Sequence, residues 1–216
     1  NTVTNFAHKS FRYIPDTAPE CENLYADIIF LIDASYSITD RIFHQYAIPF
    51  TRILAGRFDI GANKTRIGIV VYADDVYFEL PLTKCQDKLC LLNTINTITY
   101  AADSTCTGKA IARGRARMED SDPEKVEGIV VVTDGAEYCG KERVSRIKIE
   151  ADKTRAEEID VYAVGVDSET FESSQEAIDD LNGIANNQSD HKFIVKNHKA
   201  LDNTFVEKFQ KKVCVK

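Results

Sequence analysis

The chain has 216 residues, of which 44% are hydrophobic, so it can bury one sizeable core and a single domain is expected. Its 34 acidic residues outnumber its 27 basic ones, and the net charge of -7 excludes a general attraction to nucleic acid. No apolar run reaches the roughly 18 to 20 residues that cross a bilayer, and the first residues lack a signal-peptide pattern. We therefore expect a soluble fragment without membrane insertion.

The first part of the chain divides into an arm and the start of a domain. Residues 1–20 show neither helical nor strand periodicity and contain Pro15 and Pro19, so we expect an extended arm. The domain is expected to cover residues 21–216. Its first element is the apolar, isoleucine-rich run 27–32, which is typical of a central strand covered on both faces.

A helix and a hairpin are expected next. Residues 39–58 carry apolar side chains at helical spacing, and Pro49 is expected to kink this helix. The strand-like runs 66–73 and 75–82 are separated only by Asp74, which indicates a tight antiparallel hairpin.

From there, helices and apolar strands alternate to the end of the chain. Helices are predicted at 87–98, 109–118, 141–157, 175–185 and 200–212, and strands at 126–135, 160–166 and 191–196. This order predicts an α/β fold with a doubly wound, mostly parallel sheet, one antiparallel edge strand and helices on both faces.

Three polar clusters follow predicted strands or precede helices. They are "DASYS" (33–37), "STCTG" (104–108) and "TDG" (133–135). Ligands of open parallel sheets bind at the carboxyl ends of the strands, so the clusters are expected to converge there. Together they offer only oxygen ligands, which suit a hard cation such as Mg²⁺, with Mn²⁺ or Ca²⁺ as substitutes. The candidate metal ligands are Asp33, Ser35, Ser37, Thr105 and Asp134.

These residues resemble the metal-ion-dependent adhesion site of the von Willebrand factor type A domain family. Asp33, Ser35 and Ser37 match its D-x-S-x-S pattern, "STCTGKAI" is similar to its T-x-T-G-K-A-L, and "VVVTDG" supplies the second aspartate. The resemblance covers residues 26–212, is strongest with matrix and collagen-binding members, and extends loosely to invertebrate matrix proteins. It implies a six-stranded fold in which the hydroxyls ligate directly and the carboxylates ligate directly or through water.

The rim of this site differs from the family pattern at one position. Tyr36 stands where a small residue is common, so we expect its side chain to contact the partner. Together with Thr107 of the second cluster, it is expected to form the rim of the site. Each cluster also has a simpler interpretation, because Asp and Ser often cap helices and Asp-Gly often forms turns.

The six cysteines indicate a secreted, extracellular protein with disulfides, since no zinc-binding spacing occurs among them. Cys21 and Cys214 bracket the domain and are expected to pair, and Cys85 and Cys90 form a local pair. Cys106 and Cys139 lie in two of the metal loops and are expected to join them, with buried free thiols as the alternative. The sequons at Asn63 and Asn187 are possible glycosylation sites.

The resemblance implies an adhesion module whose partner is an extracellular protein, with collagen favoured. A matrix module that binds or self-associates without the metal is the alternative. An enzyme is not expected, because no nucleophile elbow, Walker motif or dinucleotide-binding motif occurs. "STCTG" resembles the phosphate loop of flavodoxin-like enzymes but does not follow the first strand, where that loop belongs.

Overall fold

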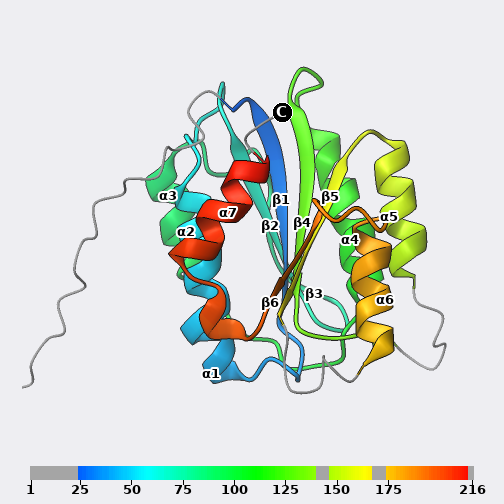
Figure 1. The fold of residues 1–216 in the computed structure, drawn as a ribbon. Helices are drawn as coiled ribbons and strands as arrows, with labels where there is room; N and C mark the ends of the chain where they lie inside the picture. Colours follow the sequence, from blue (N-terminus) through cyan, green and yellow to red (C-terminus); the bar gives the residue numbers. More distant parts are fainter. Residues whose placement is uncertain (1–23, 140–145, 167–173, 214–216) are drawn as a thin grey trace, which may run out of the picture.

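The computed structural model describes residues 24–139, 146–166 and 174–213, which build one sheet between two layers of helices (Figure 1). The sheet has six strands in the order β3-β2-β1-β4-β5-β6. They span Ala26–Asp33 (β1), Arg66–Tyr72 (β2), Val76–Leu80 (β3), Val126–Thr133 (β4), Asp160–Val166 (β5) and Lys192–Val195 (β6). Only β3, at one edge, runs antiparallel to its neighbour. The predicted fold class is confirmed.

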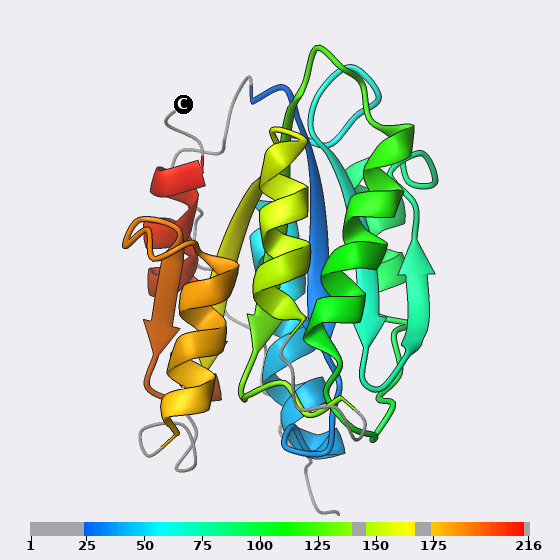
Figure 2. The same ribbon diagram turned by 90° about the vertical axis from the view of Figure 1, so that its right-hand side faces the viewer.

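Helices cover both faces of the sheet, as the views in Figures 1 and 2 show. One layer contains α1 (Asp40–Ile42), the π-helix η1 (Phe43–Ala47), α2 (Ile48–Gly56), α3 (Lys88–Ile95) and α7 (Asn203–Val213). The other contains α4 (Thr107–Arg117), α5 (Ile147–Ala156) and α6 (Gln175–Ile184). Two short 3-10 helices, η2 (Met118–Asp120) and η3 (His198–Ala200), complete the helical elements of the described chain.

Strand β1 shows why the sequence folds this way. All eight of its residues are buried, because it lies between β2 and β4 and under both helical layers. Phe30 packs with the layer of α2 and α7, whereas Leu31 packs with the layer of α4 to α6. Alternate side chains therefore supply two cores, and each large apolar side chain fully buried contributes about 1.5–3 kcal/mol.

The strand order changes direction between β1 and β4, because β2 and β3 lie on one side of β1 and β5 and β6 lie on the other side of β4. Strands β1 and β4 lie side by side although they are far apart in the sequence. Loops that follow these two strands leave the sheet at the same end and diverge to opposite sides. We call this the carboxyl end of the sheet and the other the amino end. The carboxyl end lies at the bottom of Figure 1, next to α1.

The helix around Pro49 is irregular, as its proline indicates. The chain forms the π-helical turns of η1, and α2 then continues with the proline in its first turn. The N–H of Ile48 bonds to the carbonyl of Phe43, five residues earlier. Proline has no N–H and its ring crowds the carbonyl four residues before it, and a wider turn accommodates both.

Several expected features fall on residues that are not described. They are the arm at 1–20, the pair Cys21–Cys214 and the first turn of the helix predicted from residue 141. Within the described residues, α5 begins at Ile147. Helix α4 begins at Thr107, two residues before its predicted start at 109.

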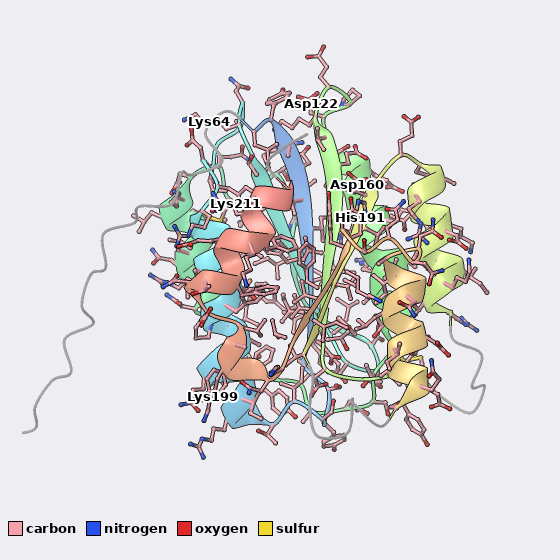
Figure 3. The ribbon with its side chains drawn as sticks, in the orientation of Figure 1. Lys64, Asp122, Asp160, His191, Lys199 and Lys211 are labelled. Atoms are coloured by element: carbon pink, nitrogen blue, oxygen red, sulfur yellow. A yellow bond between two sulfur atoms is a disulfide. The ribbon has the colours of Figure 1, made fainter. Side chains whose placement is uncertain are left out.

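A buried charge network closes the amino end of the sheet. Asp27 is fully buried, receives a bond of 2.8 Å from Arg66 Nε, and lies 3.3 Å from the ammonium of Lys125, whose side chain is also fully buried. Asn63 and Asn187 are exposed, and they lie in the loops that precede the parallel strands β2 and β6; Lys64 and His191, labelled in Figure 3, belong to the same loops. Among the described residues, none of the helices has the length and apolar character of a membrane span.

Candidate metal site

Asp33 lies at the last position of β1 and organises the loop after it. Its side chain is fully buried. One carboxylate oxygen accepts a hydrogen bond of 2.9 Å from the backbone N–H of Ser35, and the other accepts one of 2.7 Å from the hydroxyl of Thr133. Because Thr133 ends β4, this carboxylate holds the neighbouring strand ends together.

The two serines of "DASYS" extend from this buried carboxylate to the surface. Ser35 is buried and its Oγ lies 3.1 Å from the Oγ of Ser37, which is exposed. The Ser37 hydroxyl in turn donates a hydrogen bond of 2.6 Å to Oδ1 of Asp134. Residues that are 97 positions apart are thus in direct contact, so the first and third polar clusters converge.

Thr105 is brought to the same place by backbone pairing between the second cluster and the loop that follows the third cluster. Its N–H donates to the carbonyl of Tyr138 at 3.2 Å, and the N–H of Tyr138 donates back at 2.8 Å. Directly after this pair, Cys106 and Cys139 form a disulfide. The structure also contains the local disulfide Cys85–Cys90. Two loops of the candidate site are therefore joined both by hydrogen bonds and covalently.

These loops surround an open pocket of about 430 Å³ at the carboxyl end of the sheet. Ser37, Thr105 and Asp134 line it, while Asp33 and Ser35 lie buried beside them. Tyr36 and Tyr138 also line the pocket, and their side chains are 69% and 62% exposed. The pocket thus combines a polar floor with two solvent-exposed aromatic rings.

Two buried carboxylates make the site electrostatically unfavourable without a cation. Burial, and secondarily the charge of Asp33, raises the pKa of Asp134 to about 7. Burial also raises the pKa of Asp33, although hydrogen bonds from Ser35 and Thr133 partly oppose this. A cation between the carboxylates would offset both the lost hydration and the mutual repulsion.

The donor set fits a hard divalent cation. It consists of carboxylate and hydroxyl oxygens, and the described ranges contain no group of three or more His, Cys, Asp or Glu side chains that could hold a metal ion. Oxygen-only sets of this kind suit Mg²⁺, Mn²⁺ or Ca²⁺, whereas zinc sites commonly use imidazole or thiolate ligands. Ser35, Ser37, Thr105, Asp33 and Asp134 are therefore a chemically consistent set.

The assignment of Thr107 to the rim is wrong. Its side chain is fully buried, and its Oγ1 lies 3.1 Å from the hydroxyl of Tyr72. Because α4 already begins at Thr107, its hydroxyl turns towards β2 and away from the solvent.

Three contributors to the site were missed in the sequence. Thr133 bonds to Asp33, Tyr138 pairs with Thr105, and the hydroxyl of Tyr100 donates to the carbonyl of Ser35 at 3.0 Å. Thr133 belongs to the polar cluster 133–135, but its bond to Asp33 arises from the alignment of two strand ends, and tertiary pairing decides the partners of the two tyrosines.

Comparison with known proteins identifies a common architecture. The model of the von Willebrand factor type A domain family matches residues 27–208. The chain is 31% identical over 167 residues to the transmembrane cell adhesion receptor mua-3 of Caenorhabditis elegans, covering 73% of this chain and 4% of the receptor. It is 32% identical over 155 residues to matrilin-1 of Gallus gallus, covering 68% and 30%. The matched regions are thus less than a third of either relative.

A solved structure of proximal thread matrix protein 1 from the mussel byssus, with a zinc-occupied MIDAS motif, shares the fold. The two agree with a TM-score of 0.75 and 23% identity, over 91% of this chain and 47% of the mussel chain. At this identity the likeness concerns the fold.

Proposed function

Because the chain belongs to the von Willebrand factor type A domain family, we propose that it is an extracellular matrix-binding module that holds a divalent cation. Mg²⁺ is the favoured ion, with Mn²⁺ or Ca²⁺ as substitutes. In this proposal the hydroxyls of Ser35, Ser37 and Thr105 ligate directly, and Asp33 and Asp134 ligate directly or through water. The assignment is to a binding domain rather than an enzyme, in agreement with the adhesion and matrix relatives.

The proposal rests on the hydrogen bond between Ser37 and Asp134, which brings two of the polar clusters together where the carboxylates of Asp33 and Asp134 are buried. A turn or helix cap would account for each cluster alone, but not for their convergence on one pocket. Metal-loaded relatives of the fold, such as the zinc-occupied mussel protein, add support.

The partner is proposed to be an extracellular protein that presents a carboxylate, with collagen favoured. When bound, the cation supplies a positive centre that can accept one carboxylate oxygen of the partner. Ser37, Thr105 and Asp134 line the open pocket and leave its mouth accessible. Tyr36 and Tyr138 provide amphipathic surfaces beside it, which suit an apolar or imino-acid side chain next to the carboxylate.

A module that binds or self-associates without metal is the second candidate. A groove of about 680 Å³ runs between β3 and α4, away from the candidate metal ligands. Tyr77, which is half exposed, lies at this groove on the edge strand. An exposed edge strand offers unpaired backbone groups to another chain.

Calorimetric titration with Mg²⁺ and Mn²⁺ tests the metal site. Wild type should bind one cation, and Asp134→Ala should lose binding while keeping its far-ultraviolet circular dichroism. A pull-down on fibrillar collagen with Mg²⁺ or with EDTA then separates the two candidates. Retention that is equal in both conditions would favour the metal-independent module.

Secretion, the domain limits 21–216, the pairing of Cys21 with Cys214 and glycosylation at Asn63 and Asn187 stay predictions. Peptide mapping of non-reduced protein tests the pairing, and the intact mass before and after enzymatic deglycosylation tests the sequons.

A further inference from the structure

Glu137 lies three residues after Asp134 and bridges two helices with one carboxylate. Its Oε1 accepts a hydrogen bond of 2.8 Å from the backbone N–H of Gly108, in the first turn of α4. Its Oε2 accepts one of 2.9 Å from the backbone N–H of Arg146, directly before α5. The third polar loop is therefore anchored to the start of both helices.

These contacts are favourable for a general reason. The first N–H groups of a helix have no acceptor within the helix, and the peptide dipoles give this end a partial positive charge. A carboxylate that satisfies such groups forms charge-assisted hydrogen bonds, which are roughly twice as strong as neutral ones. Glu137 does this for two helices at once, so each carboxylate oxygen has a separate task.

Gly108 permits this close approach. A Cβ atom at this position would lie 2.7 Å from Cβ of Arg146, 2.9 Å from its carbonyl carbon and 3.0 Å from Oε1 of Glu137. The first two distances are shorter than real Cβ contacts allow, and one of the atoms belongs to the backbone. A glycine at the start of α4 is therefore required for Glu137 and Arg146 to meet α4.

Two further connections follow directly along the chain. The backbone N–H of Glu137 donates to Oδ2 of Asp180, on α6, at 2.7 Å. Tyr138 pairs with Thr105, and Cys139 is bonded to Cys106. Three consecutive residues thus fix the loop that begins at Asp134 to α4, α5, α6 and the Thr105 loop.

We propose that Glu137 is a positioning residue of the metal site, holding Asp134 and Thr105 at a fixed separation by bridging the amino termini of α4 and α5. This inference rests on the proposed metal-binding function. Glu137 does not touch the cation; it acts through the loop that carries Asp134. Residues that orient metal ligands in this way commonly change metal affinity about 10- to 100-fold when they are replaced.

The test is the variant Glu137→Gln, which keeps the size of the side chain. Its amide can accept a hydrogen bond from only one of the two N–H groups and turns a donor towards the other. We expect Mg²⁺ affinity, measured by calorimetry well below the melting temperature, to fall about 10-fold. Amide hydrogen exchange of Gly108 and Arg146 should accelerate in the metal-free protein. If the variant does not fold, Asp180→Ala removes the acceptor of the Glu137 N–H and should weaken Mg²⁺ binding about 3-fold or more, with faster exchange at Glu137.

Asp87→Ala is the matched control. Asp87 caps α3 by accepting a bond of 2.8 Å from the N–H of Cys90, at the amino end of the sheet. Its loss should lower the melting temperature and leave Mg²⁺ affinity unchanged. An affinity of Glu137→Gln within 2-fold of wild type, or unchanged exchange at Gly108 and Arg146, would overturn the inference alone. Absence of Mg²⁺ and Mn²⁺ binding by wild type would instead overturn the proposed function, and with it this role of Glu137.

Discussion

Replacing Asp134 by asparagine should stabilise the metal-free protein at neutral pH and abolish its stabilisation by Mg²⁺. Asp134 is 1% exposed, and its pKa is about 7 because of burial and the nearby charge of Asp33. Asparagine has nearly the same shape, and its oxygen can still accept the hydrogen bond from Ser37. The substitution therefore removes a charge with little change in packing.

The size of the effect follows from the pKa. A rise from the ordinary value of 3.8 to about 7 corresponds to a ceiling of about 4 kcal/mol, since each pKa unit equals about 1.4 kcal/mol. The asparagine remains a buried polar group, so we expect about half of this, or about 2 kcal/mol. For a domain of this size, that raises the melting temperature by about 4–8 °C.

The pH dependence has a definite sign. Between about pH 4 and pH 7 the folded protein retains a proton on Asp134 that the unfolded chain releases. The free energy of unfolding of metal-free wild type should therefore decrease as pH rises through this range and level off above about pH 7. The advantage of Asp134→Asn should be small near pH 4.5 and full at pH 8.

Thermal unfolding at pH 4.5 and pH 8, with EDTA or with Mg²⁺, checks this prediction. Mg²⁺ should raise the melting temperature of wild type at pH 8 and not that of the variant. Asp190→Asn removes an exposed carboxylate and serves as the control, for which no change is expected. A metal-free Asp134→Asn protein that is less stable than wild type at pH 8 would refute the reasoning.

Three further predictions concern other parts of the molecule. The double variant Cys106→Ser, Cys139→Ser removes a link between residues 33 positions apart, and should lower the free energy of unfolding by about 3–4 kcal/mol. Calorimetry should show Mg²⁺ binding that is about 10-fold weaker. An unchanged, wild-type affinity would show that the bond does not organise the site. Tyr36→Ala and Tyr138→Ala should reduce retention on collagen several-fold at unchanged Mg²⁺ affinity, and full retention would exclude these rings from the contact. Arg66→Met removes one partner of a buried carboxylate at the amino end and should cost about 3 kcal/mol in urea denaturation, with metal affinity unaffected; a cost below about 1 kcal/mol would contradict the account of that network.

The sequence was sufficient for the fold because its strands have unambiguous patterns. The run that forms β1 is apolar at almost every position, and only a strand covered on both faces buries all of it. Its end at Asp33 follows from the change to polar residues, and the end of β4 at Thr133 comes two residues before the predicted end at 135. Since parallel strands end together, the meeting of the two polar clusters could be predicted without coordinates.

The finer features depend on contacts that leave no local pattern. Pro49 signals an irregular helix, but the π-helical turns of η1, whose Phe43 and Ala47 are buried in the core, have no local pattern of their own. Thr107 was assigned to the rim as a member of the second polar cluster, yet it begins α4 and its hydroxyl lies beside that of Tyr72. Glu137 looks like an ordinary loop residue, because the two N–H groups that it binds become neighbours only after folding.

The exposed asparagines of the two sequons, Asn63 and Asn187, lie in loops that lead into the amino ends of β2 and β6, while the pocket opens at the carboxyl end of the sheet. A sugar chain carried by either side chain would be attached in a loop at the opposite end of the sheet from the pocket that is proposed to meet a fibre. Such glycans would hydrate the amino end of the domain and keep neighbouring copies apart at that end, without covering the pocket at the carboxyl end. The molecule would then have one adhesive end and one hydrated, non-adhesive end. It would bind a fibre in one preferred orientation, with the carboxyl end of the sheet facing the fibre.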